Sequence, residues 1–229
     1  MKQNPISVNI SGKDISYVEL LEKELERSRE NLKILRRKLG MEGMKELFAE
    51  ELAAEEVFYR EQAEGFDGTY KAANVDIEVE GVTGEEFLEW FMKKSAVNGG
   101  EELLHNHPDH WATYCAPDGT AQTAIETMAS GADGANPMLA TLTLPDPDGC
   151  VEPPIYDIPS FGAINAVDGT RFHIHSLHQF RNTEKGCKVR LGLYFPSTYS
   201  DEYIEGSKWH LAVEWKNWFD MLFADREKQ

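Results

Sequence analysis

Cysteine is scarce in this chain, with three residues among 229. Cys115, Cys150 and Cys187 are widely spaced, odd in number and form no C-x-x-C pair. A disulfide framework uses an even, regularly spaced set, so the sequence indicates a reducing compartment. We therefore expect a cytoplasmic protein in which each cysteine is a small buried or neutral residue rather than a nucleophile.

Positive charge is also in short supply. The chain has 23 Lys and Arg against 40 Asp and Glu, for a formal net charge of −17. Nucleic acid and anionic membranes both require a basic surface, so we expect neither as a partner. No apolar run approaches the ~20 residues that cross a bilayer, and the first residues lack the apolar core of a signal peptide. The hydrophobic content of 41% is typical of a globular protein with one core.

The N-terminal part of the sequence divides into a tail and a helical segment. Residues 1–13 are expected to be flexible, and residues 14–65 to be helical, with Ser11 or Asp14 as the first cap and Gly40 as a stop. Residues 15–39 follow a heptad pattern in two rows that are apolar except at Ser28: Val18, Leu25, Leu32 and Leu39, then Leu21, Ser28 and Leu35. This helix could lie on its own domain or form a short coiled coil between two subunits. We take a homodimer forward as the expectation.

Residues 66–229 have the pattern of an α+β domain. Strand-like residues in "GTYKAANVDIEVEGV" precede a short helix that Thr83 is placed to cap. Two further strand patterns, "TRFHIHSLHQFRN" and "KVRLGLYFP", flank "TEKG" and predict a hairpin. The chain ends in a long helical stretch whose apolar face includes Trp209 and Phe219. This order predicts a curved antiparallel sheet around a long C-terminal helix.

All seven histidines fall in three clusters. The first cluster, "LLHNHPDHW", contains His105, His107 and His110, and the last, "KWHLAVEW", contains His210. The middle cluster, "RFHIHSLHQF", lies on a predicted strand. Alternation along that strand places His173 and His175 on one face and His178 on the other, unless a bulge intervenes.

Two of these clusters have the spacing of metal ligands. His210 and Glu214 are four residues apart on a predicted helix, so their side chains share a face and can bind one cation. A simple surface His–Glu pair has the same spacing. His107 is followed by Pro108, which suits a ligand held on a rigid turn. Two histidines with one or two carboxylates suit Zn²⁺, and Fe²⁺ or Mn²⁺ accept the same donors.

Four segments occur in the order and style of a known enzyme family. They are "GTYKAANVDIEVEGVTGEEFLEWFM", the "HPDH" turn, "HQFRNTEKGCKVRLGLYF" and "HLAVEW". Together they resemble the 2,4-diacetylphloroglucinol hydrolase and phloretin hydrolase family over residues 66–222. Members have a helix-grip fold of the Bet v 1 type. They use a metal, normally zinc, to hydrolyse the carbon–carbon bond between an acyl group and a polyhydroxylated aromatic ring.

The resemblance implies a metal site and its ligands. His107 would be the ligand of the His-Pro turn, and His210 and Glu214 the ligands of the C-terminal helix. The fourth ligand would be a strand glutamate, Glu126 in "TAIETMASG", with Glu152 in "CVEPP" as the alternative.

The resemblance also implies residues that act on a small phenolic substrate. His178 and His110 would be catalytic and transfer protons, since imidazole titrates near neutral pH. His110 and Tyr194 would contact the substrate, and Tyr194 would orient a phenolic oxygen as part of catalysis.

Two other functions use the same residues. One keeps the metal pocket for a different reaction on a phenolic compound, by a decarboxylase, cyclase or lyase. The other is a non-catalytic ligand-binding module with the heptad helix as its oligomerisation element. A fold alone does not choose between binding and catalysis.

Overall fold

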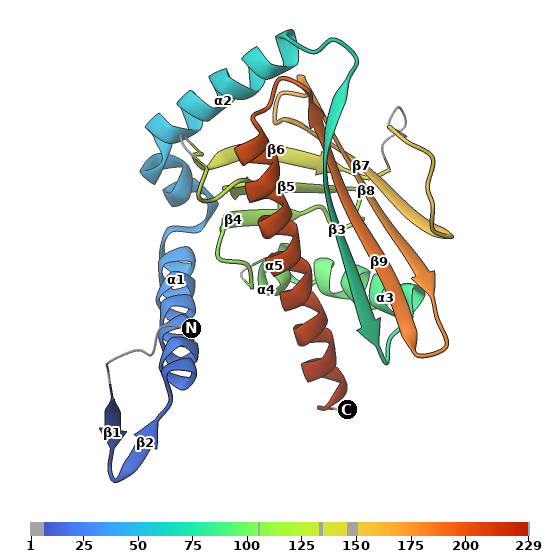
Figure 1. The fold of residues 1–229 in the computed structure, drawn as a ribbon. Coiled ribbons are helices and arrows are strands. Elements are labelled where there is room, and N and C mark those ends of the chain that lie inside the picture. Colours follow the sequence, from blue (N-terminus) through green and yellow to red (C-terminus); the bar gives the residue numbers. More distant parts are fainter. Residues whose placement is uncertain (1–6, 105, 133–134, 146–150, 229) are drawn as a thin grey trace.

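A seven-stranded antiparallel sheet forms the centre of the protein (Figure 1). The structure is a computed structural model that describes residues 7–104, 106–132, 135–145 and 151–228. The strands run in the order β3-β9-β8-β7-β6-β5-β4, so the first strand of the sheet pairs with the last. Their bounds are β3 Tyr70–Glu80, β4 His110–Cys115, β5 Ala121–Glu126, β6 Met138–Thr143, β7 Ile158–Ala166, β8 Arg171–Asn182 and β9 Gly186–Pro196.

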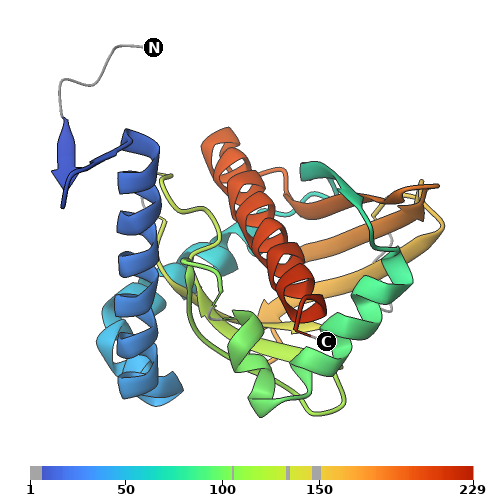
Figure 2. The same cartoon turned by 90° about the horizontal axis from the view of Figure 1, so that it is seen from below.

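Helices lie on both sides of this sheet (Figures 1 and 2). They are α1 Tyr17–Leu47, α2 Ala49–Glu64, α3 Gly84–Ser95, α4 Glu101–Leu104 and α5 Asp201–Arg226, with a 3₁₀ turn at Asn98–Gly100. On one side, Phe87 of α3 stacks against Trp215 of α5, with ring centroids 5.1 Å apart. On the other side, Met44 of α1 is buried with Ile125 of β5. Successive strand residues point to opposite faces, so Glu126 points to the α5 side.

Side chains cap the starts of α3 and α5, and the cap of α3 is the predicted Thr83. Thr83 and Glu86 form a reciprocal capping box at the start of α3. Ser200 caps α5, and its hydroxyl accepts a hydrogen bond from the N–H of Tyr203 at 3.1 Å. Gly206 lies inside α5. A Cβ there would lie 3.1 Å from Ala129, so the glycine lets α5 approach the loop after β5.

The N-terminal segment is helical as predicted, with different bounds. Ser16 caps α1, rather than Ser11 or Asp14. Gly40 divides α1 into two helical parts at the predicted stop, because its φ of 58° and ψ of −167° are non-helical and kink the chain there. Part of residues 1–13, the predicted tail, lies in a short hairpin. Val8–Ile10 and Lys13–Ile15 pair as β1 and β2. Ser11 and Gly12 both have positive φ, which matches the twist of a tight hairpin.

The heptad residues of α1 are mostly exposed within the chain. The most exposed of them are Val18 at 63%, Leu25 at 49%, Leu21 at 45% and Leu35 at 39%. The adjacent Tyr17 is 50% exposed. Only Leu32 and Leu39 are half-buried. The rest of the chain therefore does not cover this row of side chains on α1.

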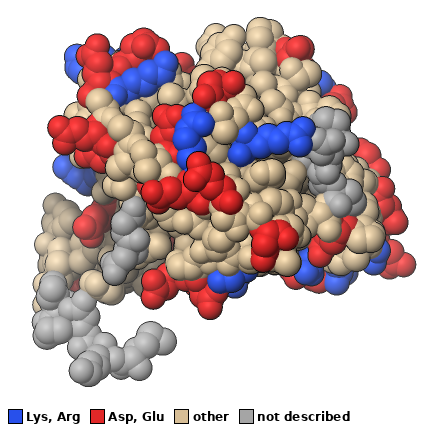
Figure 3. Space-filling model, turned by 90° about the horizontal axis from the view of Figure 1, so that it is seen from above, with Lys and Arg blue, Asp and Glu red and all other residues tan. Residues whose placement is uncertain are grey.

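The predicted α+β class is confirmed in its coarse form: a large antiparallel sheet with helices and a long C-terminal helix. Among the described residues, no helix is both long and apolar enough to cross a membrane. The face seen in Figure 3 carries more acidic than basic side chains, as the net charge implies.

Candidate metal centre

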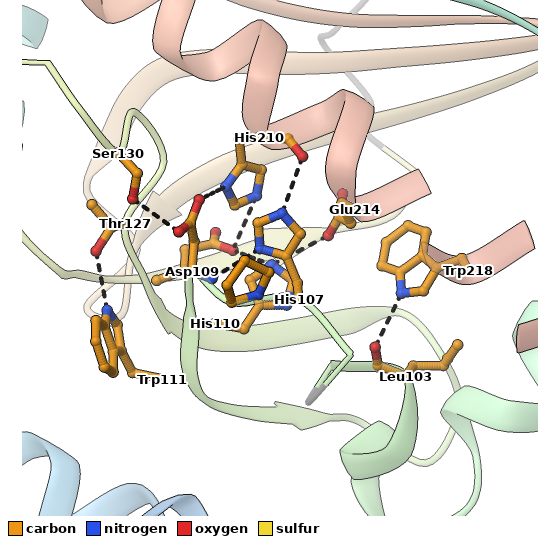
Figure 4. Close-up of polar contacts among 12 residues, drawn as sticks. Leu103, His107, Asp109, His110, Trp111, Thr127, Ser130, His210, Glu214 and Trp218 are labelled. Carbon is orange, nitrogen blue, oxygen red and sulfur yellow. Dashed lines mark hydrogen bonds and ion pairs between the residues drawn. The ribbon is translucent and has the colours of Figure 1, made fainter. Parts of the chain in front are cut away.

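Three buried histidines from two distant parts of the sequence meet beside α5 (Figure 4). His107 lies in the turn before β4, His110 is the first residue of β4, and His210 lies on α5. Their ligand atoms all lie within 4.8 Å of one another. The ring centroids of His107 and His210 are 4.4 Å apart.

Two buried carboxylates join the histidines, and the half-buried Asp109 lies 3.5 Å from Nδ1 of His210. Nε2 of His110 lies 3.1 Å from Oε2 of Glu126 and 3.2 Å from Oε1 of Glu214. Glu126 ends β5 and is the cross-strand partner of His110 on β4. Glu214 lies one helical turn after His210 on α5, as the sequence pattern predicts. The sheet register and one helical face thus bring together residues more than a hundred positions apart.

Opposite charges lie close together in this centre, so the two glutamates shift the pKa of His110, and His110 shifts the pKa of Glu126. Burial alone would lower the pKa of His110, but the hydrogen bonds and charges of Glu126 and Glu214 together raise it to about 10. Burial would raise the pKa of Glu126, yet the hydrogen bond and charge of His110 hold it below its usual value. Burial and the neighbouring His210 and His110 place the pKa of His107 far below that of a free imidazole. Without a metal ion, a protonated His110 would be the cation between the carboxylates.

His107 is held differently from His110. Its Nδ1 accepts a hydrogen bond from the backbone N–H of Asp109 at 3.1 Å. Its Nε2 lies 3.2 Å from the backbone carbonyl of His210. Both ring nitrogens therefore face backbone groups, and His110 rather than His107 lies between the two glutamates. To bind an ion as the sequence predicts, Nε2 of His107 would have to turn away from that carbonyl.

A buried arginine supports the histidine turn from α1. Arg36 is 3% exposed, and its guanidinium donates to the carbonyl of His107 at 2.6 Å and to that of Pro108 at 3.3 Å. Burial lowers the pKa of Arg36 to about 10, although the charge of Asp109 acts in the opposite direction. Sequence reasoning missed this residue, since an arginine among charged heptad neighbours has the pattern of a solvated one.

Two asparagines fix the same turn to α5. The side chain of Asn106 donates to the backbone carbonyl of Asn217 at 3.0 Å, and the side chain of Asn217 donates to the carbonyl of Asn106 at 2.8 Å. Trp218 also donates to the carbonyl of Leu103 at 3.1 Å (Figure 4). The turn is thus anchored on both sides by side chains that reach backbone oxygens.

The centre lies at the wall of a cavity of about 160 Å³ between α3, α5 and the sheet. Glu126, His210 and Glu214 line it, as does His178 on β8. Most of the remaining wall is apolar, including Phe87, Phe91, Leu142, Ile164, Trp215 and Trp218. The cavity therefore combines ionisable groups with aromatic walls.

His178 stands in this wall as a neutral imidazole. Its ring meets Trp215 edge-on, with centroids 5.0 Å apart. Burial lowers its pKa to about 4. Within the described part of the chain, its Nδ1 has no hydrogen-bond partner.

The other histidines of the middle cluster lie on the opposite face, as strand alternation predicts. His173 stacks on Phe66 at 4.5 Å, and His175 meets Tyr70 at 5.7 Å. His105 lies outside the described residues.

Tyr194 and Glu152 lie away from the centre. Leu193 lines the cavity, so the next residue of β9, Tyr194, points to the other face of the sheet. The hydroxyl of Tyr194 donates to Glu152 at 2.6 Å. Tyr194, expected from the resemblance to contact the substrate, is therefore not among the residues that line this cavity. The structure also favours Glu126 over Glu152 as the carboxylate near the histidines.

The donor set fits a divalent transition metal. Three imidazoles and two carboxylates are buried together, and Zn²⁺, Fe²⁺ and Mn²⁺ all accept such donors. Two buried carboxylates also need compensating positive charge, which a divalent ion supplies more fully than one imidazolium.

Comparisons with known proteins add little to this description. No protein-family model matches the chain, and no curated protein matches it. One solved structure, a putative uncharacterized protein from Bacillus thuringiensis, is 12% identical, with a TM-score of 0.36. The match covers 66% of this chain and 99% of that one. A similarity at this level carries no argument about fold or function.

Proposed function

We propose that the protein is a metal-dependent hydrolase, with zinc as the expected ion. It would cleave the carbon–carbon bond between an acyl group and a polyhydroxylated aromatic ring, as in acylphloroglucinols or dihydrochalcones. The observation that carries the proposal is the buried cluster of histidines and glutamates opening onto an aromatic cavity that also holds a neutral His178. The family resemblance of the sequence supports the substrate class, and with it the assignment of the sheet and α5 to a Bet v 1-type helix grip.

The ligands would come from the cluster itself. Glu126, His210 and Glu214 line the cavity, and His110 lies between the two glutamates. His107 would orient the group through its contact with the backbone of His210, or replace His110 as a ligand. The bound ion would polarise the acyl carbonyl and supply hydroxide near neutral pH.

The remaining residues would bind the ring and move a proton. The aromatic walls hold the phenolic ring by apolar contact and exclude bulk water. His178 is neutral at physiological pH, so it can take a proton from a phenolic hydroxyl and return it to the ring carbon. Water adds its oxygen to the acyl carbon, and the electron pair of the broken bond takes a proton at the ring. The products are a carboxylic acid and the free polyphenol.

A product assay tests this function. Zinc-loaded protein would be incubated with acylphloroglucinols and dihydrochalcones, and both the released acid and the polyphenol would be measured by chromatography. We expect equal amounts of the two products. His178→Gln should abolish turnover and retain the metal, whereas His175→Gln, a matched change on the opposite sheet face, should leave turnover unchanged.

Two results would contradict the proposal. If metal-loaded protein released neither product from any of these compounds, the acyl-cleaving reaction would be excluded for this substrate class. If carbon dioxide or a rearranged ring product appeared in place of the acid, the same pocket would belong to a decarboxylase, cyclase or lyase.

A further inference from the structure

The strongest feature outside the metal centre is an exposed apolar row on α1. We call it the α1 stripe, and it consists of Tyr17, Val18, Leu21, Leu25 and Leu35, each between 39% and 63% exposed. Figure 2 shows α1 at the flank of the molecule, beside the sheet and α5. A row of large apolar side chains at heptad spacing is costly to leave in water, because each contributes roughly 1.5–3 kcal/mol when it is buried.

The charges of α1 are divided between its two halves. Residues 17–26 contain four glutamates and one lysine, whereas residues 27–39 contain six arginines and lysines and one glutamate. Charges near helix ends favour this polarity through the helix dipole, but that effect reaches only the first and last turns. Here the division runs along the whole straight part of the helix up to Gly40.

We propose that the α1 stripe binds α1 of a second copy of this chain in antiparallel orientation. Antiparallel pairing places the acidic half of each helix beside the basic half of the other. A parallel pair would instead bring the two acidic halves together and the two basic halves together.

The heptad positions give a definite register for this pair. With the two-fold axis near residue 30, Leu25 packs against Leu35 of the second copy, and Leu21 packs against its Leu39. Ser28 meets Leu32, so every layer keeps at least one leucine. On the outer edge, Glu24 lies opposite Lys38 of the second copy. In a parallel pair, Glu24 and Arg29 would be the one pair of opposite charges at the flanking heptad positions.

The inner edge of α1 is already in use by its own chain. Arg29 donates to the side chain of Asn217 at 3.3 Å, and Arg36 donates to the carbonyl of His107 at 2.6 Å. These contacts fix the rotation of α1 on the domain and leave the α1 stripe facing outward. Pairing would therefore add a second copy beside α1 without displacing the contacts that support the metal centre.

Sedimentation equilibrium of the full chain tests the surface. We expect a dimer, and a shift toward monomer in Leu25→Glu, with the dissociation constant raised roughly 100-fold or more. Val57→Glu is the matched control, because Val57 is an exposed apolar residue on α2, 55% exposed and outside the α1 stripe. A monomeric wild type would overturn the proposal, as would a Leu25→Glu protein that dimerises like the control.

Charge exchange tests the orientation. Glu24→Lys alone and Lys38→Glu alone should each raise the dissociation constant about tenfold, because each puts like charges opposite one another. The double variant should recover wild-type affinity, because antiparallel pairing places Lys at 24 opposite Glu at 38. In a parallel dimer the residue at 38 does not face position 24, so Lys38→Glu would not rescue. A double variant as weak as Glu24→Lys would therefore overturn the antiparallel arrangement.

Discussion

Replacing Arg36 of α1 by methionine should loosen the turn that carries His107 and Pro108, because its guanidinium donates to the backbone of that turn. The guanidinium is buried and makes a 2.6 Å hydrogen bond to the carbonyl of His107. A hydrogen bond from a charged donor contributes roughly 1.5–3 kcal/mol, and its loss leaves a buried carbonyl without that donor. We expect a loss of about 2 kcal/mol in the free energy of unfolding. Because the turn carries His107 and His110, affinity for zinc should also fall by roughly 10- to 100-fold, as for other residues that orient metal ligands.

Two measurements separate these effects. Urea unfolding gives the stability, and competition with a chromophoric chelator gives the zinc dissociation constant. Arg37→Met is the matched control, since Arg37 is the neighbouring arginine and is exposed. Arg36→Lys should recover part of the affinity, because a lysine can still donate to one carbonyl. If Arg36→Met and Arg37→Met bound zinc equally, the account of Arg36 as a support of the metal centre would be wrong.

Three further changes follow from the same structure. His110→Ala should lower zinc affinity more than His107→Ala, since His110 lies between the carboxylates; equal losses in the competition assay would contradict this. Glu126→Ala should lower zinc occupancy and Glu152→Ala should not, and a wild-type zinc content in Glu126→Ala would remove Glu126 from the ligand set. Burial raises the pKa of Glu55 from 4.5 to about 7, so the folded state binds this proton more tightly than the unfolded state. The protonated Glu55 therefore contributes to the free energy of unfolding below the pKa of the unfolded state, and this contribution is lost as pH rises through 7. Urea unfolding at about pH 4 and about pH 8 should therefore show Glu55→Gln gaining about 1–3 kcal/mol over wild type at the higher pH only, and a gain equal at both would refute this.

Local signals predicted much of the fold. Thr83 begins α3 as expected, and the hairpin around "TEKG" forms between β8 and β9. Strand β7 and the β1–β2 hairpin were not predicted, because their sequence signals are weak or their pairing partners are distant in the chain. Strand β7 at Ile158–Ala166 contains a proline and a glycine, so its propensity is low, and pairing with β6 and β8 decides its conformation. The β1–β2 hairpin was missed because Ser11 takes the positive φ that glycine or asparagine more often supplies.

The residues of the candidate site also divide into those that local spacing predicts and those that only the folded chain brings together. The His210–Glu214 pair was predicted from helical spacing, because that geometry is local. The placement of Glu126 beside the histidines depended on the family resemblance, since only the β4–β5 register brings it opposite His110. Tyr194 was expected to contact the substrate, and it does not line the cavity, because a resemblance in sequence order does not fix which side of a strand faces the cavity. Arg36 could not be found at all, as its partners are backbone carbonyls that no sequence pattern reports.

Elemental analysis of the purified protein tests the central claim most directly. The account predicts about one tightly held transition metal per chain, retained through dialysis, as expected of a site with three or four protein ligands. The same analysis of Glu126→Ala should show a large loss. A wild-type protein that retained no metal, even after incubation with zinc, would show that His110, Glu126 and Glu214 form a closed salt-bridge cluster. The proposal of a metal centre, and of the hydrolase built on it, would then be contradicted.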